Sequence, residues 1–239
     1  MSAPTSSDSP FPTINEHGRL RIALTLGFAV GQGVVLFGCA GRFDLPQGWL
    51  YLGLWLGCIV ITGLLILARH PQLINQRGRP STDAQTWDRI WIKLCGIAPF
   101  AVVAVAGLDR GRFGWSTIAA GWAVIGSLIF CGGATLVASA MLTNPFFETM
   151  VRIQTDREHR VESSGPYQTV RHPGYLGWIL QYLSAPLILG SGWTFVPAGT
   201  MILLYLVRTG LEDHMLQTDL PGYGSYANEV RFRVIPGIW

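Results

Sequence analysis

The residues with the clearest potential for chemistry lie in the stretch GPYQTVRHPGYLGW, from Gly165 to Trp178. Proline fixes φ and disfavours helical geometry in the preceding residue, so we expect turns at Gly165 and His172 and a helix that starts at Pro173. The free N–H groups of a first helical turn attract anions, and Arg171 and His172 flank them. The stretch predicts an anion-binding helix start where a polar segment enters an apolar run.

Two aromatic residues and two glycines follow on the same predicted helix. Tyr175 and Trp178 lie three residues apart and share one helix face, and Gly174 and Gly177 have the same spacing and allow close approach to the backbone. An interfacial aromatic anchor with small residues for packing also explains these four residues. It does not explain a histidine between an arginine and a proline, so we favour a binding function for His172 and its neighbours.

A polar segment, Asn144 to Tyr167, precedes this stretch. Its composition alone indicates a solvated loop. Its position beside the predicted helix start supports an alternative, in which Gln154, His159 and Glu162 hydrogen-bond a polar ligand.

A third group of charges, VRTGLED, ends the last apolar run. Arg208 and Glu212 are four residues apart and can pair on one helix face, although glutamate before arginine is the more stabilising order. Such charges can also simply reach from a membrane helix to water. The short Gly190-Ser191-Gly192 turn makes this run an antiparallel neighbour of the helix after His172. We therefore expect Arg208 and Glu212 to point into the same pocket as His172.

The elements that position these residues are those of a membrane protein. Mean hydropathy is +0.35, and charged residues make up 13% of the chain, about half the share of a soluble domain. Four apolar runs of roughly 20 residues are each long enough to cross the hydrocarbon. They are Leu20 to Ala40, Trp49 to Ala68, Ile90 to Leu108 and Trp115 to Leu142. Two shorter runs, Gly174 to Leu189 and Trp193 to Val207, predict a helical hairpin.

The basic residues predict the orientation. All but Arg42, Arg110 and Arg112 of the 17 lysines and arginines fall in segments on the same side as the N-terminus. The positive-inside rule then makes both termini cytoplasmic. We expect a multi-pass integral membrane protein, of the kind found in a bacterial inner membrane.

Several functional classes are disfavoured by what the sequence lacks. The four cysteines lie in apolar runs without C-x-x-C spacing, so neither a disulfide framework nor a zinc or other metal site is expected. We find no Walker motif, no GxGxxG and no basic stripe for a nucleic acid. The partners expected are the membrane and a lipophilic small molecule or lipid, and the oligomeric state stays open.

From Asn144 to Trp239 the chain resembles the isoprenylcysteine carboxyl methyltransferases and, more distantly, the phosphatidylethanolamine N-methyltransferases. The resemblance is carried by SSGPYQTVRHPGYLGW, by R-x-x-x-E-[ED] from Arg208 to Asp213, and by the ending Y-x-x-Y…PG. Sterol reductases that use NADPH carry a stretch similar to R-H-P-x-Y-x-G, usually with Asn where this chain has Gly174. The preceding GPY and the following R-x-x-x-E-D favour the methyltransferases.

The resemblance implies S-adenosylmethionine as the methyl donor. The implied cofactor-binding residues are Gln154, His159, Arg160, Val161, Glu162, Tyr167, His172, Pro173, Gly174, Tyr175 and Glu212, and we add Arg171 because a cation beside the helix start suits the cofactor's carboxylate. Arg208 and Glu212 are the expected catalytic residues, and Arg208 and Trp178 are expected to face the methyl acceptor. Asp213 stands where the family commonly has a second glutamate, and it has the same charge with a shorter reach.

These observations predict an all-α multispan membrane protein with four full spans, a C-terminal helical hairpin and cytoplasmic cofactor-binding segments. Residues 1–18 are expected to form a disordered tail, 19–142 the four-helix transmembrane part, and 143–239 the cofactor-binding part with an amphipathic C-terminus that anchors on headgroups or covers the pocket. The predicted function is S-adenosylmethionine-dependent methylation of a lipophilic carboxylate, amine or thiol. An NADPH-dependent reductase of a sterol-like lipid and a non-catalytic membrane scaffold are the alternatives.

Overall fold

The computed structural model describes residues 14–79 and 85–239, and this part of the chain is all-α, as predicted, with no β-strand. Its helices are α1 (Glu16–Ala40), α2 (Pro46–Arg69), α3 (Pro71–Gly78), α4 (Thr86–Gly107), α5 (Trp122–Thr143), α6 (Pro173–Leu189), α7 (Phe195–Asp219) and α8 (Tyr223–Glu229). A π-helical turn, Leu108–Phe113, extends α4, and short 3-10 turns occupy Thr155–Arg157 and Gly165–Gln168.

Four helical segments are long and apolar enough to cross a membrane: Glu16–Ala40, Pro46–Arg69, Thr86–Phe113 and Trp122–Thr143. They correspond to the four predicted spans. The fourth starts later than Trp115 because the Ser116 backbone N–H is held by the Asp109 carboxylate, 2.7 Å away. Residues 1–13 of the predicted tail lie outside the described part. Residues 16–18 are helical, contrary to the prediction, because Asn15 caps α1 by accepting a hydrogen bond from Gly18 N.

The hairpin of the two last long helices is present, with one difference from the prediction. Helix α6 begins at Pro173, as expected, whereas α7 continues well beyond Val207 to Asp219. The polar second half of α7 packs against the neighbouring segments through two buried charged residues, Arg208, 4% exposed, and Asp213, 0% exposed. At a rise of 1.5 Å per residue α7 is about 37 Å long.

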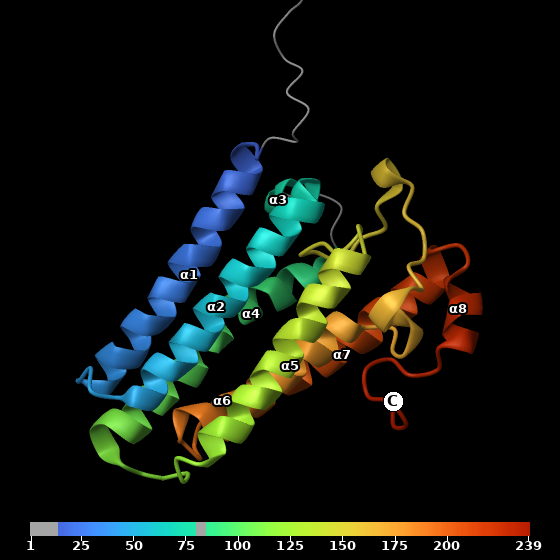
Figure 1. Cartoon of the computed structure of the whole chain (residues 1–239). Coiled ribbons are helices and arrows are strands. Elements are labelled where there is room, and N and C mark those ends of the chain that lie inside the picture. Colours follow the sequence, from blue (N-terminus) through green and yellow to red (C-terminus); the bar gives the residue numbers. More distant parts are fainter. Residues whose placement is uncertain (1–13, 80–84) are drawn as a thin grey trace, which may run out of the picture.

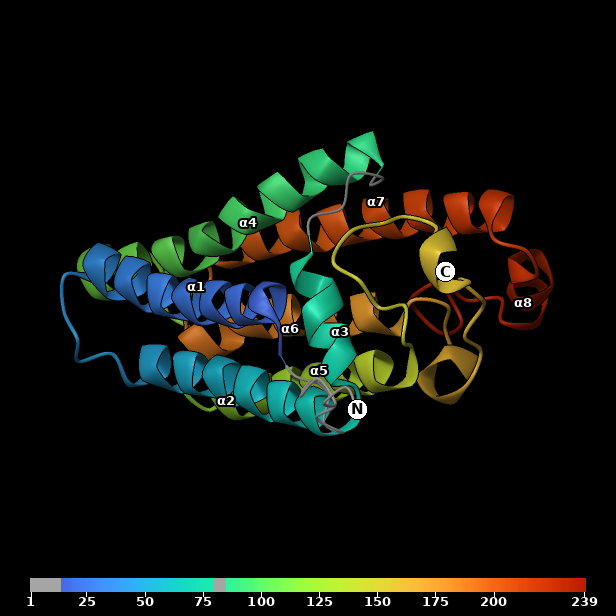
Figure 2. The same cartoon turned by 90° about the horizontal axis from the view of Figure 1, so that it is seen from above.

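The polar parts of the chain gather toward one end of the helix bundle (Figure 1). The segment between α5 and α6, the end of α7, and α8 lie there together, and α6 and α7 run side by side beneath α4 (Figure 2). At the opposite end the π-helical turn meets the α6–α7 turn. The buried Asp109 carboxylate joins them by accepting hydrogen bonds from Ser116 Oγ and Ser191 Oγ, both at 2.5 Å.

Helices α5 and α6 pack backbone to backbone. A Cβ on Gly133 would lie 2.5 Å from the Gly177 carbonyl oxygen, and a Cβ on Gly177 would lie 2.6 Å from the Gly133 oxygen. Small residues that permit such contact are typical of membrane helix interfaces. This contact fixes the height and rotation of α6 and therefore the side chains at its start.

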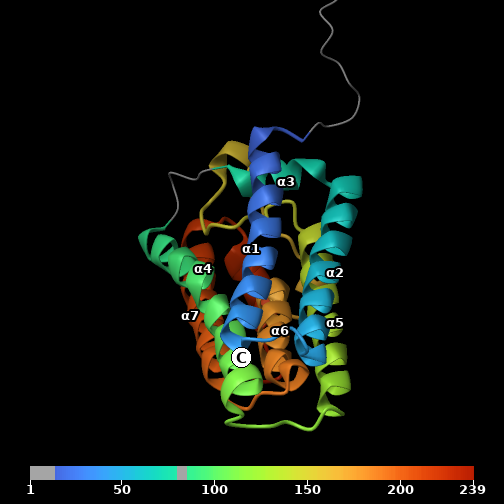
Figure 3. The ribbon, with the colours of Figure 1, turned by 90° about the vertical axis from the view of Figure 1, so that its left-hand side faces the viewer.

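Helix α3, which the sequence did not predict, crosses the start of α1 (Figure 3). A Cβ on Gly78 would lie 2.0 Å from the His17 carbonyl oxygen, so the two backbones are in contact. Asn75 Oδ1 accepts a hydrogen bond from Asn15 N at 3.1 Å. The segment is short and polar, so it lacks the long apolar pattern that identified the other helices.

We expect Gly133→Ala to lower the free energy of unfolding by about 1–3 kcal/mol, because its methyl group would collide with the α6 backbone. Gly132→Ala is the matched control, since the space around its Cβ is open, and it should not lower stability, because alanine has the higher helix propensity. Thermal unfolding of the two variants in detergent measures the difference. Equal stability of both would contradict the close α5–α6 contact.

Candidate functional site

A cavity of about 910 Å³ extends from the polar segments into the helix bundle. It is lined by every residue that the sequence singled out for a site: Gln154, His159, Arg160, Val161, Glu162, Tyr167, Arg171, His172, Pro173, Gly174, Tyr175, Trp178, Arg208 and Glu212. Most of its other lining residues on α1, α2 and α4 are apolar, among them Phe28, Trp55, Ile59 and Ile92. The cavity therefore connects a polar end with an apolar one.

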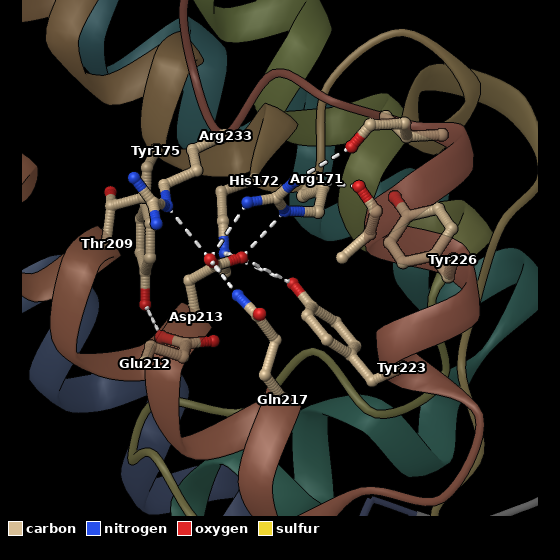
Figure 4. Close-up of polar contacts among 12 residues, drawn as sticks. Arg171, His172, Tyr175, Thr209, Glu212, Asp213, Gln217, Tyr223, Tyr226 and Arg233 are labelled. Atoms are coloured by element: carbon tan, nitrogen blue, oxygen red, sulfur yellow. Dashed lines mark hydrogen bonds and ion pairs between the residues drawn. The ribbon is translucent and has the colours of Figure 1, made fainter.

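Asp213 is the centre of a buried polar cluster at the polar end (Figure 4). Its Oδ1 accepts hydrogen bonds from Arg171 Nε at 2.7 Å and Tyr223 OH at 3.0 Å. Its Oδ2 accepts from Arg171 Nη2 and Arg233 Nε, both at 2.9 Å, and from Gln217 Nε2 at 2.7 Å. Burial by itself would raise the pKa of Asp213, but His172 and the two arginines hold it well below its usual range.

This cluster uses the donors of Arg171, one of the expected cofactor ligands. The remaining nitrogen, Nη1, donates to the carbonyl oxygens of Val230 at 2.8 Å and Arg231 at 3.0 Å. The backbone N–H groups of Arg171 and His172 donate to the carbonyls of Phe232 and Arg233. The C-terminal strip thus pairs with the protein through its backbone, and Val234 is fully buried. The strip is therefore held by its packing against the site.

Glu212 turns away from this cluster and into the cavity. Its Oε2 accepts a hydrogen bond from Tyr175 OH and lies 3.9 Å from Arg208 Nε. The Tyr175 ring stacks on the His172 imidazole, with centroids 5.5 Å apart and planes inclined by 9°. Tyr175 therefore connects the start of α6 with the carboxylate on α7, as the predicted antiparallel hairpin requires.

Arg208 is 4% exposed and is held by groups outside the predicted site. Its Nη2 donates to the Thr149 carbonyl at 2.9 Å and lies 3.0 Å from Asp88 Oδ1. The guanidinium lies over the Trp91 ring, 3.9 Å from its centroid. Its Nε is buried and has no hydrogen-bond partner among the described residues. Arg208 therefore presents a fixed, unused donor.

The polar segment after α5 is tied down by its own charged groups. Arg152 pairs with Glu148 at 3.0 Å and Asp156 at 2.7 Å. The Gln154 side chain is engaged at both ends, since Oε1 accepts from Arg157 at 2.8 Å and Nε2 donates to the Phe146 carbonyl at 2.7 Å. Gln154 thus lines the cavity and also holds the loop together, and the segment is an ordered wall rather than a solvated loop.

His159 contributes a neutral imidazole to this wall. Its Nδ1 accepts a weak hydrogen bond from Gln154 N at 3.4 Å, and its ring packs on Phe146 with centroids 4.7 Å apart. Burial lowers the pKa of His159 to about 4, with Glu212 opposing the shift and Arg152 and Arg157 adding to it. At neutral pH the imidazole is therefore an uncharged hydrogen-bonding group.

Several residues of the site were missed by sequence reasoning. Asp88 and Trp91 of α4 support Arg208, and Tyr223 of α8 supports Asp213. Asp88 had a usable signal, since it is a carboxylate at the edge of an apolar run, where a buried charge requires a partner. No sequence signal marked Tyr223, because its contact with Asp213 depends on how α8 folds back toward α7.

We expect Asp213→Asn to destabilise the protein by about 3 kcal/mol, because Arg171 and Arg233 would lose their buried counter-ion. The C-terminal strip should then become accessible to protease. Asp219→Asn is the control, as this exposed residue ends the same helix. Limited proteolysis followed by mass spectrometry detects cleavage near Arg231 and Arg233, and equal resistance of the two variants would argue against the cluster as a clamp.

A second prediction concerns His159 and acid. The pKa of His159 is lowered in the folded protein, so on acidification the unfolded chain takes up its proton first, near pH 6.5. Stability should fall as the pH drops from about 6.5 towards 4. His159→Gln should flatten this dependence. Unfolding midpoints at a series of pH values measure the slope, and identical slopes would contradict the assigned environment.

The chain was also compared with known proteins. Residues 122–220 match the family model described as phospholipid methyltransferase. This range contains α5, α6 and α7, and so the contact between α5 and α6, the start of α6, and the Arg208–Asp213 segment. No protein with curated annotation matches the chain significantly. The part of the chain that builds most of the site, less than half of its length, is therefore similar to the phospholipid methyltransferases.

Proposed function

We propose that the protein transfers a methyl group from S-adenosylmethionine to a lipophilic acceptor. The main support is the continuous cavity, which has hydrogen-bonding groups at one end and apolar helix faces at the other. A soluble polar donor and a membrane-borne acceptor need these two environments within one site. The basic residues make the polar end the cytoplasmic one under the positive-inside rule.

The chemical groups at the polar end suit the cofactor. Glu212 contacts Tyr175 and Arg208 through Oε2, which leaves Oε1 for ribose hydroxyls. In the first turn of α6, Tyr175 N and Leu176 N bond to the His172 carbonyl, so the N–H of Gly174 remains for a carboxylate. Because Arg171 is occupied by Asp213, we assign it a positioning role in place of direct contact.

S-adenosylmethionine supplies a methyl group made electrophilic by its sulfonium centre. The protein's contribution is to hold the reactants in line and to exclude water, which can account for most of the acceleration of such a reaction. Tyr175, Trp178 and Tyr205 form a packed aromatic wall beside Arg208, with Trp178 and Tyr205 centroids 5.4 Å apart. All three residues line the cavity.

Arg208 is assigned to the acceptor. Its unused Nε donor is buried, and its position is fixed by Asp88 and Trp91. A carboxylate acceptor would be oriented by this donor without a base, whereas an amine or thiol would release its proton to Glu212.

The proposal predicts that S-adenosylhomocysteine binds the purified protein and that Glu212→Gln weakens this binding about tenfold, because a hydrogen bond to a charged group contributes about 1.5–3 kcal/mol. Glu229→Gln on α8 is the control of equal charge change, since Glu229 is exposed and does not line the cavity. Titration calorimetry gives both affinities. Binding of NADPH but not of S-adenosylhomocysteine would overturn the proposal in favour of a reductase.

A further inference from the structure

Two arginines in the cavity wall have no place in the site described so far. Arg21 of α1 and Arg77 of α3 both line the cavity. Neither forms an ion pair with a carboxylate in residues 14–79 and 85–239. Arg171 and Arg208, by contrast, each have an acidic partner within 3.0 Å. Arg21 and Arg77 thus bring positive charge to the cavity wall without a paired carboxylate among the described residues.

The position of Arg77 is fixed by packing. Its Nη1 donates to the Phe147 carbonyl at 3.0 Å, and its guanidinium lies 5.5 Å from the centroid of the Phe147 ring. The same ring packs beside Trp178, with centroids 5.8 Å apart. Arg77 is therefore held in place through an aromatic residue that also contacts the start of α6, and its other nitrogens remain for a ligand.

Arg21 is brought to the same region by the α1–α3 contact. A Cβ on Gly78, the residue after Arg77, would lie 3.2 Å from Arg21 Cβ. The pKa of Arg77 is lowered to about 9, chiefly by burial and in addition by the charges of Arg21 and Arg208, with Glu148 and Tyr175 opposing the shift. Three cations around one cavity repel each other, and an anion bound among them would relieve this repulsion.

Apolar residues border this basic region. Leu24 and Phe28 lie one and two turns beyond Arg21 on α1, and Ile66 and Leu67 of α2 line the cavity as well. Figure 3 shows α1 between α2 and α4, with α3 across its start. An anionic group at Arg77 would thus have room for an attached hydrocarbon chain along these helices.

We infer that Arg77, with Arg21, binds the anionic group of the acceptor, which is therefore a phosphate or carboxylate joined to an apolar chain. The inference rests on the proposed function only in taking this lipid to be the methyl acceptor. Arg77 and Arg21 then determine specificity, while Arg208 and Glu212 serve the reacting atom.

The test compares amphiphiles that share one chain: dodecyl phosphate, dodecanoate and dodecanol. Calorimetric titration of the full-length protein in a non-ionic detergent should show that at least one of the two anions binds about tenfold more tightly than dodecanol, as expected for a charge-assisted hydrogen bond. The better anion identifies the headgroup. Inorganic phosphate is titrated in parallel, and binding as tight as that of the amphiphiles would overturn the lipid assignment in favour of a free-anion site.

Arg77→Gln should abolish the preference for anions and leave both dodecanol and S-adenosylhomocysteine affinities unchanged. Arg21→Gln should reduce the same preference for anions. This second variant tests the inference if Arg77→Gln does not fold. Arg19→Gln is the matched control, since Arg19 is exposed on the same helix and does not line the cavity. A preference that persists in both cavity variants overturns the inference. An anion preference that depends on Arg77 in a protein that does not bind S-adenosylhomocysteine would keep the anion site and reject the proposed function.

Discussion

The rest of the site depends on one constraint, which is the burial of the Asp213 carboxylate away from water. Burying a charge costs several kcal/mol unless its oxygens are fully paired, and here the donors come from the segment before α6, from α7 itself, from α8 and from the C-terminal strip. Movement of any one of these segments would remove at least one hydrogen bond from the Asp213 carboxylate. One side chain thus holds the start of α6 and the C-terminus of the chain together.

Glu212 and Asp213 are adjacent on α7, and helix geometry directs their side chains to different parts of the site. Successive residues of an α-helix point about 100° apart, so Asp213 faces the inner cluster while Glu212 faces the cavity. Arg208, one turn earlier, lies on the face of Glu212. The shorter reach of aspartate suits position 213, because its oxygens already have short contacts with Arg171 and Gln217. Glutamate at 212 has the length to reach Tyr175.

The rigid and the adaptable parts of the protein are separate. Glycine contacts lock α5 against α6, and the buried Asp109 holds the far end of the α6–α7 hairpin. Helices α1 and α2, in contrast, expose many large apolar side chains, as expected of surfaces in contact with lipid. The cavity lies between these two parts, so its polar wall is fixed while its apolar wall borders the membrane.

The sequence by itself determined the fold class, the four spans, the start of α6 at Pro173 and the convergence of the Arg171–Trp178 and Arg208–Glu212 segments on one cavity. These follow from local properties: apolar run length, the geometry of proline and the short Gly-Ser-Gly turn. Only the tertiary structure decided that Arg171 serves Asp213, that Asp88 and Trp91 support Arg208, and that α3 brings Arg77 to the cavity. Those contacts join residues distant in the sequence, and pairing between buried charges depends on which side chains packing brings within about 3 Å, which no local pattern encodes.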